Sequence, residues 1–228
     1  MKICIIFRGE NVRHTDTVCG SDRKYINVLM LWDNLKKTVI DDLENNGYDV
    51  DIAFITYDSD ILQNIKDIIN PKYIFIENKI NQNTNFSNVL SFINKHDTFY
   101  DRFVILRCDI KYKTYITKWP KWDEKGITIV NKDVHWPKLK LYSDMIFIVD
   151  SCEVKIFTDA YYASIYENSI HGLGGYLYNN NIPFHLMYEG YYHNTMHPLF
   201  VWVNDYDLHL DLDNPLYIEP IQDISQWQ

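Results

Sequence analysis

The sequence predicts an α/β protein in which helices flank a mainly parallel central sheet, folded as a single domain of 228 residues. The first reason is that short apolar runs alternate with segments of helical periodicity along residues 1–110. Parallel strands need such crossover helices to connect them. The second reason is composition, because 46% apolar and 23% charged residues are ordinary for a globular protein. No Pro-, Gly- or Ser-rich linker divides the chain, so we expect one domain.

The first strand and the first helix have clear boundaries. Residues 2–7 (KICIIF) form a continuous apolar run, which is typical of a strand covered on both faces. Residues 24–45 carry apolar side chains at helical spacing. Asn46 and Gly47 then favour the left-handed turn that ends a helix.

The same pattern continues to residue 110. We predict strands at 49–57, 72–78 and 102–110, and helices at 59–69 and 85–95. Asp58 or Ser59 is a suitable N-cap for the first of these helices, and Pro71 would stop it. We expect residues 103–108 to form the central strand.

The alternation breaks after residue 110. Further strands are predicted at 126–131, 144–150 and 154–159, followed by a helix from 160 to about 171. Residues 183–209 are expected to be aromatic strand or loop, and an acidic tail follows from residue 211.

Charge and hydropathy exclude several classes of protein. The net charge of −9 argues against a nucleic-acid binder, which usually carries a basic face. No apolar run approaches the ~18 residues that span a bilayer, and the first ten residues do not resemble a signal peptide. The four cysteines lack metal-ligand spacing. We therefore expect a cytoplasmic, reduced protein with no membrane span and no nucleic-acid partner.

Polar clusters follow three of the predicted strands. Arg8 and Gly9 follow the first strand, Thr56 and Tyr57 close the second, and the fourth ends in Arg107-Cys108-Asp109. Ligands of open α/β sheets bind beyond the carboxyl ends of the strands. We expect Arg8, Thr56 and Asp109 to line one cleft within reach of a single nucleotide. The alternative is that strand ends are polar simply because loops meet water.

Common catalytic motifs are absent from the sequence. It contains no G-x-G-x-x-G, no G-x-x-x-x-G-K-[ST] and no G-x-S-x-G. The glycines of residues 171–177 (HGLGGYL) could hold a phosphate, or Gly172 could simply end a helix. His193 and His197 have metal-like spacing, but no Glu follows His193 as in H-E-x-x-H.

The remaining chemistry is one strand-end carboxylate among cations and aromatic residues. Arg107 and Asp109 alternate along a strand and so share a face, either as a site or as a structural ion pair. A departing nucleoside diphosphate needs its charge neutralised by a metal ion or by basic side chains, here Lys111 and Lys113. As a strand-end carboxylate, Asp109 is expected to contribute little to stability.

Three segments carry a resemblance to a known family: KICIIFRG at the start, ITY at residues 55–57, and YDRFVILRCDIKYKTYITKW from residue 100. Together they resemble glycosyltransferases encoded by large DNA viruses and some microbes. Those proteins are similar to the GT-A fold, a Rossmann-like domain that binds nucleotide-diphospho-sugars. The resemblance covers roughly residues 1–150 or, at its widest, the whole chain. It implies a nucleotide-binding half (1–110), an acceptor-side half (111–210) and a C-terminal tail (211–228).

The resemblance also implies an activity and roles for residues. The activity is transfer of a sugar from a nucleoside-diphosphate-sugar donor to a glycan or protein acceptor. Asp109 matches the last position of the family's D-x-D motif, which binds Mn²⁺ or Mg²⁺, whereas Arg107 replaces the first Asp. This implies catalytic roles for both residues, in which Arg107, like Lys111 or Lys113, could take over part of the charge of the metal. The resemblance implies further roles for the following residues: donor contacts for Arg8, Gly9, Thr56, Tyr57, Lys111 and Lys113, and acid–base catalysis for His193, with Glu189 and His197 nearby.

Several alternatives stay open at the level of sequence. Asp144 or Asp150 could supply the missing second carboxylate, and Asp133 or His135 could act as acid or base. The tryptophans of the polar excursion could form an acceptor surface or pack into the core: Trp119, Trp122 and Trp136. A non-catalytic nucleotide- or carbohydrate-binding module is the alternative function, and an interaction protein is a third. Donor, acceptor, stereochemical course and oligomeric state stay undefined.

Overall fold

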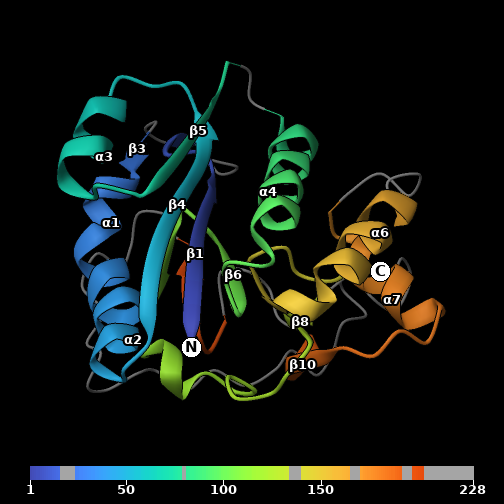
Figure 1. Cartoon of the computed structure of the whole chain (residues 1–228). Coiled ribbons are helices and arrows are strands. Elements are labelled where there is room, and N and C mark those ends of the chain that lie inside the picture. The colour runs from blue at the N-terminus through green and yellow to red at the C-terminus, as the bar shows by residue number, and fades with distance from the viewer. Residues whose placement is uncertain (16–23, 79–80, 134–139, 165–169, 192–196, 203–228) are drawn as a thin grey trace.

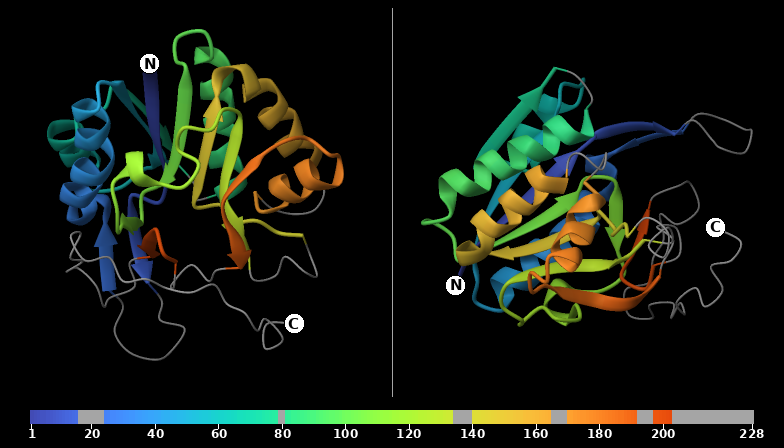
Figure 2. Two further views of the ribbon diagram at one scale, coloured as in Figure 1. Left: turned by 90° about the horizontal axis from the view of Figure 1, so that it is seen from below. Right: turned by 90° about the vertical axis from the view of Figure 1, so that its right-hand side faces the viewer.

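One seven-stranded sheet organises the molecule (Figures 1 and 2). The computed structural model describes residues 1–15, 24–78, 81–133, 140–164, 170–191 and 197–202. The strand order is β10-β8-β9-β6-β1-β4-β5, and β6 (Arg102–Arg107) is its central strand. This confirms the predicted α/β fold and the predicted centre of the sheet.

Six of the seven strands run parallel to one another, and β9 runs antiparallel to both of its neighbours. The strands from the first half of the chain are contiguous in the sheet, as are those from the second half, and the two sets meet where β6 pairs with β9. The strands have these bounds: β1 Lys2–Gly9, β4 Asp49–Tyr57, β5 Tyr73–Glu77, β8 Ile127–Lys132, β9 Ile146–Asp150 and β10 His185–Tyr191.

Helices cover both faces of the sheet, which explains the continuous apolar runs of the central strands (Figure 1). On one face lie α1 (Val28–Leu35), a π-helical turn (Lys36–Ile40), α2 (Asp41–Asn45) and α3 (Leu62–Ile68). On the other lie α4 (Gln82–His96), α6 (Val154–Ser164) and α7 (Gly172–Asn179). Side chains of β1 alternate between the two cores, since Ile5 packs in one and Ile6 in the other.

The first predicted helix begins four residues later than the sequence indicated. Lys24–Asn27 form β3, which pairs antiparallel with β2 (Val12–Thr15). Asn27 then caps α1, because its Oδ1 accepts a hydrogen bond from the Met30 amide at 3.2 Å. The two-stranded hairpin therefore takes the residues that the apolar pattern assigned to the helix.

The prediction of a strand at residues 154–159 is wrong. These residues belong to α6, which begins directly after β9 and a 3₁₀ turn (Ser151–Glu153). Its buried residues recur at helical spacing: Val154, Phe157, Ala160, Tyr161 and Ser164. A short apolar run such as VKIF fits a strand or a buried helix equally well.

Two short strands complete the described structure. β7 (Ile110–Tyr112) pairs antiparallel with β11 (Phe200–Trp202), which brings the aromatic C-terminal segment against the end of β6. The tail that was predicted from residue 211 lies outside the described residues. Among the residues that are described, no helix is both long and apolar enough to cross a membrane.

Candidate functional site

The candidate site lies where the strand order reverses. From β1 the chain continues to β4 and β5 on one side, whereas β6 pairs with the other side of β1. Such a reversal places loops on opposite faces of the sheet and is where open α/β sheets bind ligands. Arg8 of β1 and Arg107 of β6 are register partners at the carboxyl ends of these strands. The sequence thus brings two guanidinium groups to the switch point.

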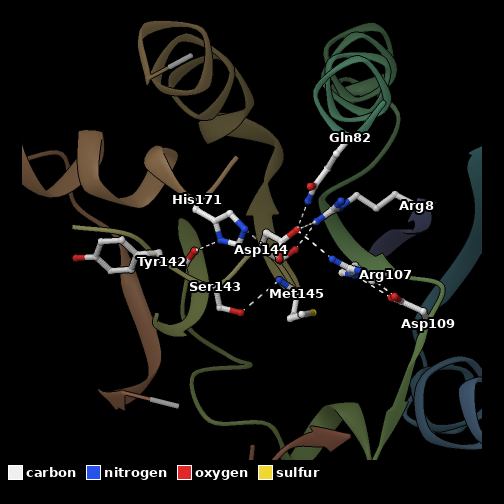
Figure 3. Close-up of polar contacts among 9 residues, drawn as sticks. All are labelled: Arg8, Gln82, Arg107, Asp109, Tyr142, Ser143, Asp144, Met145 and His171. Atoms are coloured by element: carbon white, nitrogen blue, oxygen red, sulfur yellow. Dashed lines mark hydrogen bonds and ion pairs between the residues drawn. The ribbon is translucent and has the colours of Figure 1, made fainter. Parts of the chain in front are cut away.

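Arg107 binds a carboxylate on each side (Figure 3). Its Nε and Nη2 donate to the two carboxylate oxygens of Asp109 at 2.8 and 2.6 Å, and its Nη1 lies 3.4 Å from Oδ2 of Asp144. Burial alone would lower the pKa of Arg107, but the two carboxylates outweigh it and raise the pKa above its ordinary value. Arg107 and Asp109 therefore form the structural ion pair that their alternation along the strand allowed.

Arg8 is almost fully buried, and Asp144 neutralises it. Nη2 of Arg8 lies 3.0 Å from Oδ2 of Asp144 and also donates to the Asp144 carbonyl. The guanidinium lies over the Phe86 ring, 5.2 Å from its centroid. Burial lowers the pKa of Arg8 despite the attraction of Asp144. The Nε atom of Arg8 is buried and has no hydrogen-bond partner in the described part of the chain.

Asp144 is the carboxylate shared by both arginines. It lies just before β9, and it also accepts a hydrogen bond from Nε2 of Gln82 at 2.5 Å. Burial would raise the pKa of Asp144, but Arg107 and Arg8 hold it well below its ordinary range. Of the two carboxylates that flank this strand, Asp150 lies at the opposite end of β6, where it binds Arg102 at 2.6 Å.

Two members of the cluster were missed by the sequence analysis. Gln82 is the first residue of α4, and His171 precedes α7, with its Nε2 3.9 Å from Oδ1 of Asp144. Nδ1 of His171 lies 2.9 Å from the Tyr142 carbonyl (Figure 3). Gln82 belongs to no motif, and His171 opens the HGLGGYL segment, in which only the glycines were candidates. The only signal in the sequence was that both lie next to a predicted helix boundary.

Gly9 and Thr56 form the neighbouring strand end. Gly9 has φ +93°, a conformation that favours glycine, and a Cβ built on it would meet no atom within 4 Å. The Thr56 hydroxyl donates to the Gly9 carbonyl at 2.8 Å, so Thr56 supports this turn. The Tyr57 carbonyl accepts from Nδ2 of Asn11 at 3.1 Å, and burial raises the pKa of the Tyr57 phenol to about 12.

Arg8, Thr56 and Asp109 meet at one end of the sheet, as predicted, but all three are buried. The structure thus supports their convergence at one end of the sheet.

The two predicted lysines differ in their surroundings. Lys113 is buried, and its Nζ donates to the His197 carbonyl at 3.0 Å. Lys111 is half-buried on β7, where it pairs with Val201 of β11. His197 is fully buried and stacks on Phe200, with ring centroids 4.2 Å apart. These contacts give Lys113 and His197 a structural role in joining β7 to the C-terminal segment.

Several other candidate residues have structural roles or lie outside the residues that the structure describes. Trp119 and Trp122 are buried in the core, so the idea that they form an exposed acceptor surface is wrong. Glu189 on β10 is exposed, and its Oε2 lies 3.8 Å from Nζ of Lys132. Three candidates lie outside the described residues: His135, Trp136 and His193.

The glycine run of residues 172–175 opens α7 and does not break a helix. A Cβ on Gly174 would lie 2.5 Å from Cγ of Tyr142, and a Cβ on Gly175 would lie 2.5 Å from the Lys140 carbonyl oxygen. Glycine therefore lets α7 approach the segment before β9, which favours the packing explanation over a phosphate cradle.

A metal ion at Asp109 stays a prediction. The described residues include no group of three or more His, Cys, Asp or Glu side chains that could hold a metal ion. Arg107 also occupies both oxygens of Asp109 and separates this residue from Asp144. This donor set does not fit a metal site as it stands.

Comparisons with known proteins do not assign this chain to a family. No family model matches the chain, and no curated protein matches it. A crystal structure described as a "putative nucleotide-diphospho-sugar transferase" from Desulfovibrio desulfuricans G20 is similar to 81% of this chain and 78% of that chain. The identity is 11% and the TM-score 0.43, so the likeness supports no argument about activity. The fold class of this chain rests on its own sheet order.

Proposed function

We propose that this protein is a glycosyltransferase that binds a nucleoside-diphosphate-sugar at the switch point between β1 and β6 and moves the sugar to a glycan or protein acceptor. The observation that carries the proposal is the pair of arginines at these two adjacent strand ends. Residues 1–110 would bind the nucleotide, and residues 111–210 would receive the acceptor.

The arginines suit a diphosphate for reasons of charge and shape. A guanidinium group binds phosphate oxygens with two parallel hydrogen bonds, as it binds a carboxylate. Arg107 is the more exposed of the two, with a side chain 17% exposed against 2% for Arg8. We propose that Arg107 contacts the diphosphate directly, while Arg8 contributes positive charge from its buried position.

Asp144 and Asp109 would keep these cations in place before the donor arrives. Buried charges are costly unless they are paired, and each guanidinium here has a carboxylate partner. A preorganised cation stabilises a leaving diphosphate more as its negative charge grows, which lowers the barrier to transfer.

Gly9 would allow the ligand to come close to the backbone. The space around its missing Cβ is open, and the turn is fixed by the Thr56 hydroxyl. Thr56 would therefore act as a positioning residue, and Tyr57 would contact the base or the ribose. Lys111 remains a candidate for a second contact to the diphosphate.

Transfer would proceed by attack of an acceptor hydroxyl on the anomeric carbon of the donor. The bond from that carbon to the diphosphate oxygen breaks, and the nucleoside diphosphate leaves with the bonding electrons. The proton of the hydroxyl goes to a base, for which His193 is proposed.

A non-catalytic nucleotide- or carbohydrate-binding module is the second candidate. It is favoured by one observation, that Arg107 occupies both oxygens of Asp109 and so restricts this carboxylate.

The test is a calorimetric titration of UDP-, GDP- and CMP-sugars, each with and without Mn²⁺, followed by product detection after long incubation. We expect a diphosphate donor to bind more tightly than the monophosphate CMP-sugar and to release its sugar. Arg107→Lys should weaken binding, whereas Arg102→Lys at the opposite end of β6 should leave it unchanged. Binding without turnover would support the binding module, and the absence of binding by any donor would refute both the glycosyltransferase and the nucleotide-binding form of the module.

A further inference from the structure

The edge strand β5 leaves an apolar surface open. It pairs only with β4 among the described strands, and it lies at the edge of the sheet (Figure 1). Phe75 is 56% exposed and Ile76 is 38% exposed. A groove of about 420 Å³ lies beside the strand, between β5 and α4, and its lining includes Tyr73, Phe92 and His96. Apolar edge strands without protection are pairing sites.

The other edge of the sheet is built differently. The register between β10 and β8 shifts between Tyr188 and Tyr191, an irregularity of the kind that prevents strands from adding to an edge. The β5–β4 pairing is regular along its whole length, from Tyr73 to Glu77. β5 is therefore the edge that is able to accept another strand.

We infer that β5 pairs antiparallel with β5 of a second copy of this chain, about a two-fold axis at Phe75, so that the two sheets join into one. The backbone direction supports this pairing. The Glu77 carbonyl accepts from the Asp58 amide on the β4 side at 2.9 Å. Because residues alternate along a strand, Ile74 and Ile76 turn their N–H and C=O groups toward the free edge.

Of the three possible axes, the one at Phe75 is the only one that gives both exposed apolar residues of the strand, Phe75 and Ile76, an apolar partner. With the axis at Phe75, Ile74 faces Ile76 of the other copy, and the two Phe75 side chains meet beside the groove. An axis at Ile74 would place Ile76 opposite Lys72, and an axis at Ile76 would place Phe75 opposite Glu77. The axis at Phe75 also places Tyr73 of each copy opposite Glu77 of the other, and Glu77 already accepts hydrogen bonds from Asn85 and Asn88 of its own copy.

The pairing at the axis can be tested by a disulfide cross-link between the two copies. Ile74 and Ile76 would exchange both backbone hydrogen bonds across the pair, which makes Phe75 a non-hydrogen-bonded pair. The Cα atoms of such a pair are about 4.5 Å apart, within the range that a disulfide can bridge. Two copies of Ile74 would be two residues out of register with each other and out of reach.

Sedimentation equilibrium of the wild type, Phe75→Lys and Ile156→Lys tests the interface. Ile156 is an exposed apolar residue of α6 and is the matched control for added charge. We expect a wild-type dimer and an unchanged Ile156→Lys dimer. Phe75→Lys should raise the dissociation constant by at least about tenfold, because like charges face each other at the axis.

Cysteine trapping tests the register. In a background with Cys19→Ser and Cys152→Ser, Phe75→Cys should give a covalent dimer on oxidation, and Ile74→Cys should not. The inference is overturned by a monomeric wild type at the highest soluble concentration, by a Phe75→Lys dimer as stable as wild type, or by equal trapping at both positions. A monomer that binds a strand of another protein would likewise contradict it.

Discussion

Arg107 and Asp144 approach to 3.4 Å, between Nη1 and Oδ2, although 37 positions separate them in the chain. Arg107 ends a strand of the first half of the sheet, and Asp144 precedes the antiparallel strand β9 of the second half. Together with Arg8 and Asp109 they form a cluster of two cations and two anions at the switch point. This cluster has a structural role in pairing buried charges and a proposed role in binding the donor, and variants of its members separate the two.

Replacement of Arg107 by Lys should weaken donor binding at least about tenfold, because an ammonium group cannot form two parallel hydrogen bonds to phosphate. Titration calorimetry measures this change. The control is Arg102→Lys, which breaks a comparable buried ion pair with Asp150 at the other end of β6. Both variants should lose stability, but Arg107→Lys alone should lose affinity. Equal affinities for the two variants would remove Arg107 from the donor site.

Asp109→Asn should reduce the free energy of unfolding by about 1–3 kcal/mol, because it leaves the Arg107 guanidinium without a full partner in a buried site. This replaces the expectation from sequence that Asp109 contributes little to stability. Urea unfolding measures the change. Asp58→Asn, an exposed carboxylate directly after β4, is the control and should stay within about 0.5 kcal/mol of wild type. Identical stabilities would show that the Arg107–Asp109 pair is not formed in solution.

His197 should make the protein less stable at acidic pH. Burial, reinforced by Lys113, lowers the pKa of His197 to about 3, against about 6.5 in the unfolded chain. As the pH falls below about 6.5 the unfolded chain takes up a proton that the folded chain does not. The contribution to stability is therefore lost at about 1.4 kcal/mol per pH unit until the folded pKa is reached.

Urea unfolding of the wild type and His197→Asn, from about pH 7 to about pH 4, tests this assignment. Asparagine can accept the hydrogen bond that Nδ1 of His197 accepts from the Leu199 amide. The variant should lose stability less steeply than wild type over this range. Parallel curves for the two proteins would refute the assignment.

Gly174→Ala should destabilise the protein by about 1–3 kcal/mol, because the added methyl group would overlap the Tyr142 ring. Donor affinity should stay unchanged, since the glycine run serves packing. Asn179→Ala, at an exposed position of the same helix, is the control. A weaker affinity at unchanged melting temperature would instead favour the phosphate cradle considered for this segment.

The parts of the fold set by local pattern could be predicted from the sequence. Continuous apolar runs identified β1, β4, β5 and β6, since strands of a covered parallel sheet are apolar on both faces. Residues 154–159 could not be assigned, because a short apolar run does not distinguish a strand from a buried helix. Lys24–Asn27 was misassigned because its partner strand, β2, is short and polar and left no signal.

The candidate site was predictable only in part, because one of its carboxylates depends on the direction of a strand in the second half of the sheet. Arg8, Arg107 and Asp109 follow apolar strands, so their shared end of the sheet follows from parallel strand order. Asp144 joins them because β9 runs antiparallel and brings its first residues, rather than its last, to that end. Strand direction in the second half depends on tertiary packing, which is why the sequence could not choose between Asp144 and Asp150.

A crystal structure of the protein with a bound nucleoside-diphosphate-sugar tests the central proposal most directly. We expect the diphosphate to lie over Gly9 with its oxygens at about 2.7–3.2 Å from the Arg107 guanidinium nitrogens. A diphosphate bound in the groove between β5 and α4, or at the opposite end of the sheet beside Arg102, would contradict it.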